Sequence, residues 1–314
     1  MNIMAGDTKT GAPAHHALFY DNAEEYTRGI GAFVAEGLTA GEAVLVALPC
    51  ADLDLIRDRI GGASGQVTFI DMTGPAANPA RIIPAVRQFT RAHHGRSRAV
   101  GQCMWAGRTA AETREATRHE SLVNRAFAGE PVAFLCPYHT GELSEDILAD
   151  AARTHTHIQC RGQTRPSPGY DGAALAEVIA ASALPGPPAR AEALGFSSTG
   201  DLPSVRRHVR RHAARVRLPV ERTEDLIVAA NELATNTLFH GGGPGSCCIW
   251  RHAGTLACEV SGPGHVTDLL AGYRPPSAST GGGTGLWLVS QLCDLTEQRT
   301  GVGGTTTRLH MAIR

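Results

Sequence analysis

The stretch that decides the fold of the C-terminal third is ELATNTLFH at residues 232–240. Within it, Glu232, Asn236 and His240 stand four residues apart, so a helix places their side chains on one face. Asn is a weak residue in the middle of a helix, and its presence therefore calls for a second reason. A carboxylate, a carboxamide and an imidazole stacked one turn apart predict the polar floor of a binding site. The alternative is a chance polar ridge on the helix surface.

Two glycine-rich segments follow in the chain. Residues 259–264 (EVSGPG) end a strand-like run, and residues 280–286 (TGGGTGL) open a helical run. Glycines directly before a helix let backbone N–H groups approach a phosphate at the positive end of the helix dipole. Each segment alone is typical of a flexible turn. Together with the helix at 232–240, and in this order, they predict a nucleotide site.

The elements around these motifs predict a two-layer α/β sandwich over residues 196–314. A basic helix begins after Asp201, a second helix runs from about Glu221 to His240, and strand-like runs follow both. The chain thus has helices first and an antiparallel sheet afterwards, closed by a hairpin. The arginines of the first helix are typical of a solvated face.

This order of motifs, with a Gly-Thr-Thr run before the last strand, resembles the GHKL superfamily of gyrases and histidine kinases. The branch that it looks like is that of the bacterial anti-sigma-factor serine kinases. The resemblance implies a Bergerat-type ATP-binding fold, with ATP and Mg²⁺ as cofactors. It also implies Glu232 as the catalytic base and Asn236 as the Mg²⁺ ligand, since an amide oxygen suits that hard cation. The other nucleotide contacts that it implies are His240, Gly262, Gly264, Gly281, Gly283, Thr284, Gly285, Leu286, Thr305 and Thr306.

The site departs from this family at Gly262. The family's first glycine box reads Asp-x-Gly, and its Asp accepts a hydrogen bond from the adenine amino group; here Gly262 takes that place. Loss of a hydrogen bond to a charged acceptor costs about 1.5–3 kcal/mol. We therefore expect weak ATP binding, binding of another nucleotide, or a module that works by binding alone, and tighter adenine binding once an Asp is restored. Asp268 is expected in a lid between His265 and Gly282, away from the adenine.

The first half of the chain predicts a second α/β domain. Five strand-like apolar runs alternate with helical patterns over residues 15–161, which indicates a RecA-like, mostly parallel sheet with helices on both faces. Residues 1–14 are polar and small and are expected to be disordered. The Pro- and Gly-rich stretch at 162–195 is expected to be an interdomain linker, which leaves 196–314 as the C-terminal domain.

Short patterns in this half resemble the sensory domain called MEDS, which has a RecA-like sheet without the ATPase motifs. They are HHALFYD at 15–21, GLTAGE at 37–42, CPY at 136–138 and TH at 154–155. The resemblance implies a sensor of a ligand or signal. Polar and aromatic residues at strand ends and in loops are the candidates for that role, because α/β sheets place ligands there; the alternative is that most are core or capping residues. The candidates are His16, Tyr20, Trp105, Glu120, Cys136, Tyr138 and His155.

Composition and charge exclude several classes of protein. The 29 Lys plus Arg balance 30 Asp plus Glu, which gives no electrostatic footprint for DNA or an anionic membrane. No apolar run reaches the roughly 18 residues of a membrane span, and the start of the chain lacks a secretory pattern. The eight cysteines form no C-x-x-C pair. Reduced core thiols in a cytoplasmic protein are therefore favoured over a metal site.

Two hypotheses of function follow from the resemblances. In the first, the sensory domain controls a serine/threonine kinase of the anti-sigma-factor type that acts on an anti-anti-sigma (STAS-type) protein. In the second, the module is a catalytically silent switch that sequesters a sigma factor or another partner. A DNA-binding role for the basic helix is disfavoured by the near-zero net charge. The signal, a small molecule or a protein, stays open, and so does assembly into a homodimer.

Overall fold

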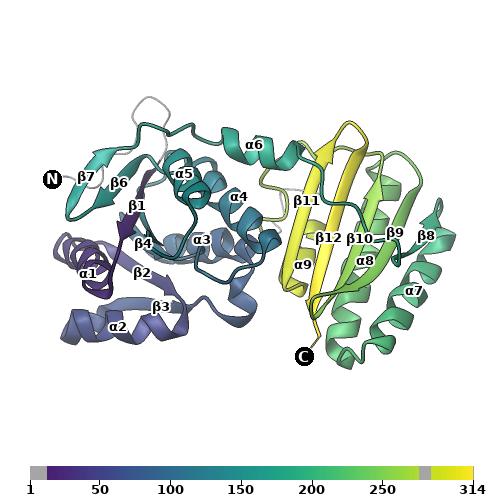
Figure 1. Ribbon diagram of the computed structural model, residues 1–314, viewed down its shortest axis with the longest axis horizontal. Coiled ribbons are helices and arrows are strands. Elements are labelled where there is room, and N and C mark those ends of the chain that lie inside the picture. Colours follow the sequence, from purple (N-terminus) through teal and green to yellow (C-terminus); the bar gives the residue numbers. More distant parts are fainter. Residues whose placement is uncertain (1–12, 276–283, 314) are drawn as a thin grey trace. The chain divides into compact units, whose positions relative to one another are not determined.

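The computed structural model describes residues 13–275 and 284–313 (Figure 1). These residues form two compact units, and the division falls between Ala176 and Glu177. Each unit has its own sheet and its own buried core. None of the helices in these ranges is both long and apolar enough to cross a membrane.

The first unit is built on a seven-stranded sheet in the order β3-β2-β4-β5-β1-β6-β7. All neighbouring strands are parallel except β6 and β7, which pair antiparallel. The central strands are nearly continuous apolar runs because both of their faces are buried. The strands are β1 (Ala14–Tyr20), β2 (Ala43–Leu48), β3 (Val67–Asp71), β4 (Ser97–Gly101), β5 (Val132–His139), β6 (His157–Cys160) and β7 (Gln163–Pro166).

Helices cover both faces of this sheet, as the alternation of the sequence predicted. α1 and α2 pack on the face that carries Leu18 and Val46, and α3, α4 and α5 lie on the opposite face. α4 begins at a capping box, in which Thr109 and Glu112 satisfy each other's backbone N–H groups. The helices are α1 (Ala23–Thr39), α2 (Cys50–Ile60), α3 (Ile82–Ala92), α4 (Ala110–Ala126) and α5 (Glu145–Thr154), with 3₁₀ turns at Gly61–Gln66, Gly74–Ala77 and Pro79–Arg81.

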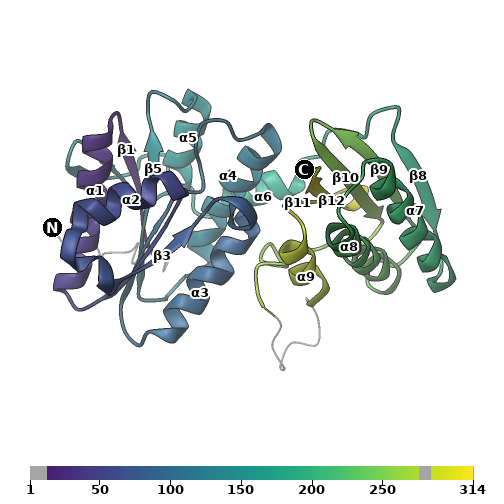
Figure 2. The same ribbon diagram turned by 90° about the horizontal axis from the view of Figure 1, so that it is seen from below.

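The second unit is the two-layer sandwich that the sequence predicted. Its five-stranded sheet has the order β11-β12-β10-β9-β8 and is antiparallel throughout. α7, α8 and α9 cover one face, with α8 packed against both other helices (Figure 2). The elements are a 3₁₀ turn (Thr199–Asp201), α7 (Leu202–Arg215), α8 (Val220–Phe239), α9 (Thr284–Leu292), β8 (Glu192–Phe196), β9 (Gly245–His252), β10 (Thr255–Gly262), β11 (Leu295–Gly301) and β12 (Gly304–Ala312).

The segment 162–195, which we expected to be a linker, contributes a strand to each sheet. β7 pairs with β6 in the first unit, and β8 pairs with β9 in the second. The alanine-rich stretch between them forms α6 (Ala174–Ala181). At the other end, β1 already begins at Ala14, and residues 1–12 of the segment expected to be disordered lie outside the described residues.

Candidate functional site

A pocket of about 310 Å³ opens in the second unit between α8, the end of β10 and the first turn of α9. Apolar atoms form most of its surface and a few polar groups converge on it, as in many small-molecule sites. The lining residues that the sequence predicted are Asn236, His240, Gly262, Gly264, Gly285, Leu286 and Thr305. The others are Leu233, Thr237, Gly241, Val260, His265, Val266, Ala271, Gln298 and Thr307.

The predicted polar floor lies along α8 and its C-terminal end, where Asn236 and His240 line the pocket and Glu232 does not. Glu232 and Asn236 are half-buried and face Gly285 in the first turn of α9. A Cβ atom on Gly285 would lie 2.9 Å from Glu232 Oε2 and 3.0 Å from Asn236 Nδ2, so a larger residue would displace these two side-chain ends. Arg222 holds the far end of α9, because its guanidinium donates to the carbonyl oxygen of Leu292 at 2.9 Å.

The remaining motif residues lie at the edges of the pocket. His240 ends α8, is exposed, and donates its backbone N–H to Asn236 O at 2.8 Å. Thr284 is the exposed first residue of α9. Gly281 and Gly283 lie outside the described residues. The contacts predicted for these two glycines therefore stay predictions.

The strand register separates Thr305 from Thr306. Gly262 of β10 pairs with Thr305 of β12, and alternate residues of a strand face opposite sides of a sheet. Thr305 and Thr307 therefore face the pocket, while Thr306 lies on the other face of the sheet. Thr305 Oγ1 also donates to Gly264 O at 2.8 Å, which fixes the glycine segment. Thr307, rather than the predicted Thr306, therefore lines the pocket beside Thr305.

Gly262, where the resemblance implies the family's Asp, lies on the pocket side of β10. A Cβ atom on Gly262 would lie 2.2 Å from Thr237 Cγ2. The Thr237 hydroxyl donates to Leu233 O at 2.9 Å, which stabilises this rotamer of a side chain that is stiff at χ1. The methyl group of Thr237 therefore fills the space that an acidic side chain at 262 would need.

Gln298 and Thr307 are pocket residues that sequence reasoning missed, because only the pairing of β11, β12 and β10 brings them there. Gln298 offers both a donor and an acceptor to the pocket. Asp268, in contrast, is engaged within its own loop. Its carboxylate accepts from Leu270 N–H at 3.0 Å and pairs with Arg274 at 3.0 Å, and Asp268 is not among the residues that line the pocket.

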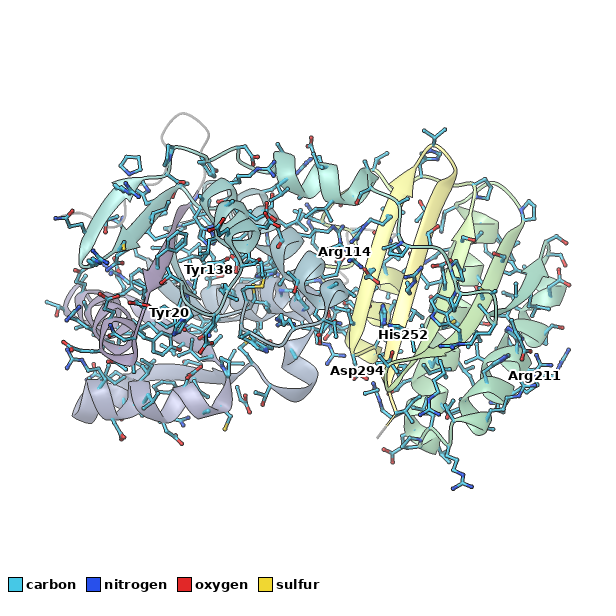
Figure 3. All side chains as sticks on the ribbon, in the orientation of Figure 1. Tyr20, Arg114, Tyr138, Arg211, His252 and Asp294 are labelled. Atoms are coloured by element: carbon cyan, nitrogen blue, oxygen red, sulfur yellow. The ribbon has the colours of Figure 1, made fainter. Side chains whose placement is uncertain are left out.

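The arginines of α7 bind neighbouring elements of the same unit. Arg210 pairs with Glu224 of α8 at 3.0 Å. Arg211, labelled in Figure 3, and Arg215 both pair with Glu192 of β8. These contacts support the interpretation of the basic run as a solvated helix face that also anchors the edge strand.

In the first unit, three of the predicted sensory residues meet on the α4 side of the sheet. Glu120 lies on α4, Cys136 on β5 and His155 directly after α5, and His15 of β1 joins them. Glu120 Oε2 lies 3.1 Å from His15 Nε2 and 3.4 Å from Cys136 Sγ. The same oxygen lies 3.5 Å from His155 Nε2. We call these four residues, each at most 5 % exposed, the buried cluster.

The other sensory candidates do not belong to the buried cluster. His16 and Tyr20 lie on the opposite, α1 face of the sheet, because strand residues alternate. Tyr138 lies on the α4 face beside the cluster, and Figure 3 labels it together with Tyr20. Trp105 lies in the loop after β4, where the Arg108 guanidinium stacks 3.5 Å above its ring. Of the seven predicted sensory residues, three therefore lie in the buried cluster and four lie outside it.

Burial sets the electrostatics around the cluster. Desolvation lowers the pKa of His15 to about 4, so its imidazole is neutral at pH 7. Desolvation likewise lowers the pKa of His16 to about 3 and raises the pKa of the Cys136 thiol well above its usual value. Burial therefore disfavours the charged forms of His15, His16 and Cys136.

Two protein families match the chain in separate regions. The MEthanogen/methylotroph, DcmR Sensory domain (MEDS) matches residues 14–156, and the Histidine kinase-like ATPase domain matches residues 197–311. The matches fall in the two units of the structure and confirm both resemblances. The chain is therefore a signalling regulator in which a MEDS sensory domain precedes a histidine kinase-like ATPase domain, and the latter implies ATP as a ligand.

The solved structures to which the chain is similar include the SiaB-SiaC complex from Pseudomonas aeruginosa. That match has 12 % identity and a TM-score of 0.30, and it covers 38 % of this chain and 88 % of the other. A second is the structure of the RsbU and RsbW domains of Rv1364c from Mycobacterium tuberculosis, with 16 % identity and a TM-score of 0.28. It covers 66 % of this chain and 49 % of the other. A search of curated proteins gave no significant match.

Proposed function

We propose that this protein is a cytoplasmic regulator whose sensory domain controls a serine/threonine kinase of the anti-sigma-factor type. Its substrate is then a Ser or Thr hydroxyl on an anti-anti-sigma (STAS-type) protein. The observation that carries the proposal is the approach of Glu232 and Asn236 of α8 to Gly285 in the first turn of α9. In this assignment a base, a metal-ligand amide and a helix N-terminus lie together, and the amide and the helix N-terminus line the pocket.

The described residues fit a Mg²⁺-bound nucleotide. Leu233, Val260 and Leu286 give the pocket apolar walls for a base, and Gly285 leaves room beside the floor that a Cβ atom would fill. Asn236 offers a neutral amide oxygen, which suits Mg²⁺. When bound, ATP supplies the phosphoryl group that is transferred. In this assignment Asn236 holds the cation, and the backbone at Gly285 contacts the phosphates.

Glu232 has a separate role in this proposal. Its carboxylate accepts the proton of the attacking hydroxyl and so makes the partner's oxygen a better nucleophile. Because the carboxylate also lies near Gly285, a side chain at that position would disturb both the phosphate contact and the base. The site thus depends on the glycine at 285 as much as on the two polar residues.

The direct test is transfer of labelled phosphate from Mg·ATP to an anti-anti-sigma protein of the same genome by the full-length chain. We expect stoichiometric labelling of a Ser or Thr in the partner, and none with Glu232→Gln. Labelling that persists at the wild-type rate in Glu232→Gln contradicts the assigned base. ATP binding without labelling of any partner that the chain binds contradicts the kinase proposal.

A second candidate function is a catalytically silent switch that sequesters a sigma factor or another partner. The observation that favours it is the contact between Gly262 and Thr237, which occupies the place of the family's adenine-binding carboxylate. In that case ATP binding is weak or absent, and partner binding alone transmits the signal. Complex formation that is equally tight with and without ATP, with no phosphate transfer, would support the switch.

A further inference from the structure

The buried cluster of His15, Glu120, Cys136 and His155 lies in the sensory unit and takes no part in the nucleotide chemistry proposed above. One ligand atom from each residue lies within 4.8 Å of the others. Polar groups buried so closely need either protons shared between them or a cation. The hydrogen bonds on the outer side of the cluster show which atoms carry protons.

The tautomer of His155 is set by the end of α5. His155 Nδ1 lies 2.8 Å from the carbonyl oxygen of Ala151. A carbonyl can only accept, so Nδ1 carries the proton of the neutral ring and Nε2 presents a lone pair to the cluster. This Nε2 is buried, and among the residues that the structure describes it has no hydrogen-bond partner.

Asn124 sets the tautomer of His15 in the same sense. Asn124 Nδ2 donates to Thr154 O at 2.7 Å, which turns its Oδ1 toward His15 Nδ1 at 3.2 Å. His15 Nδ1 therefore donates, and its Nε2 presents a lone pair to the cluster, 3.1 Å from Glu120 Oε2. Imidazoles bound outward through Nδ1–H with Nε2 facing inward are typical of metal ligands.

Four of the six separations within the cluster lie close to those of a tetrahedral ion, and all six are within 4.8 Å. Zn²⁺ bonds of about 2.0–2.2 Å to nitrogen and oxygen and about 2.3 Å to sulfur place neighbouring ligand atoms about 3.3–3.6 Å apart. Glu120 Oε2 has neighbours at 3.1, 3.4 and 3.5 Å, and His15 Nε2 lies 3.4 Å from Cys136 Sγ. We propose that His15, Glu120, Cys136 and His155 bind one Zn²⁺ ion in the sensory domain.

Four protein ligands close the coordination shell, which is the pattern of a structural rather than a catalytic zinc site. The ion would hold β1, α4, β5 and the segment before β6 together. Cys103 orients the carboxylate, because its thiol donates to Glu120 Oε1 at 2.7 Å and leaves Oε2 facing the cluster. Cys103 is therefore a positioning residue in this site and does not bind the metal.

The experiment uses the full-length chain, kept reduced and stripped of metal with a chelator, and Co²⁺ as the spectroscopic probe. We expect one Co²⁺ per chain, with the visible absorption of a tetrahedral ion and a thiolate-to-cobalt charge-transfer band. Added Zn²⁺ should displace the Co²⁺ and remove both signals. A wild-type chain that remains folded without metal and takes up neither ion overturns the proposal, since protons then bridge the cluster.

Variants distinguish this site from other thiols and from a general loss of folding. Cys136→Ser should remove the charge-transfer band, whereas Cys248→Ser, a matched loss of a thiol in the second unit, should leave it unchanged. Asn124→Ala should keep the band and weaken Co²⁺ binding by roughly 10–100-fold, because it removes only the outer partner of His15. Circular dichroism checks folding, and His155→Gln replaces Cys136→Ser if that variant does not fold. A band that survives in Cys136→Ser overturns the ligand assignment.

Discussion

Glu232 and Asn236 lie one turn apart on α8, and the proposed mechanism gives them different roles. Asn236→Ala should weaken Mg²⁺-dependent ATP binding by about 10–100-fold, because the cation loses an oxygen ligand. Glu232→Gln should leave binding within about twofold and slow phosphate transfer by roughly 10²–10⁴-fold, because a base acts only on the reaction. Calorimetry measures binding and phosphate labelling measures transfer. Identical effects of the two substitutions, with native circular dichroism, would contradict this division of roles.

Because the Thr237 methyl group fills the space beside Gly262, restoring a carboxylate there requires two substitutions rather than one. Gly262→Asp alone should lower the unfolding temperature, because Thr237 must leave the rotamer in which it bonds Leu233 O. Gly262→Asp combined with Thr237→Ala removes the clash and should tighten ATP binding roughly tenfold or more. Thr237→Ala alone is the matched control. If the double variant binds ATP no better than this control, the adenine does not lie beside residue 262.

Gln298 is the polar side chain of the pocket that we expect to contact the base in place of the missing Asp. Its carboxamide is buried, lines the pocket and matches the donor–acceptor pair on an adenine edge. Gln298→Leu keeps the volume and should weaken ATP binding by about 5–10-fold, near the loss of one net hydrogen bond. Thr306→Val, on the opposite face of the same sheet, should have no effect. Equal losses in both variants would indicate a general effect on the sheet.

Local sequence patterns predicted the polar residues of α8. The strand residues of the site depend instead on pairing between segments that are far apart in the sequence. The spacing of Glu232 and Asn236 is a property of one helix, so the sequence contains it. The choice between Thr306 and Thr307 depends on the register of β12 with β10, which no single segment specifies. His15 was missed for a similar reason, because its partners come from α4, β5 and the end of α5 and form no local motif.

At the scale of elements, β8 should stabilise the second unit when that unit is produced as an isolated fragment. β8 pairs with β9 along all its residues, and Phe196 is 3 % exposed. A fragment covering 177–314 should therefore unfold about 10 °C higher than one covering 197–314, because burial of a Phe contributes about 1.5–3 kcal/mol. Thermal unfolding followed by circular dichroism measures the difference. Equal unfolding temperatures would mean that the edge strand is dispensable.

The edge strands β7 and β8 are two elements that the sequence failed to predict. Helices and strands with clear periodicity were predicted in the correct order in both units. β7 and β8 fell inside the predicted linker, because proline and glycine in 162–195 dominate the local signal. Both are short edge strands, where few side chains are buried and the period of two is weak. Their pairing partners, rather than their own residues, determine them.

At the scale of the whole molecule, the proposed zinc ion gives the two units different responses to chelation. Metal binding that requires the folded site adds to stability only where the ligands lie. Removing the metal should lower the unfolding temperature of the first unit by at least about 5 °C and leave the second unit unchanged. Calorimetry of the full chain, with ATP added to identify the second transition, measures both. A shift of both transitions by the same amount would contradict a site confined to the sensory unit.

The contact between Gly262 and Thr237 also has an evolutionary consequence. A carboxylate that arises at position 262 by one mutation meets the threonine methyl group, and a smaller residue that arises first at 237 gains nothing until the carboxylate follows. Each first step is neutral or harmful, so natural selection does not favour either path back. Relatives of this chain should therefore carry either an acidic residue at position 262 with a small residue at position 237, or the glycine–threonine pair. Mixed combinations should be rare.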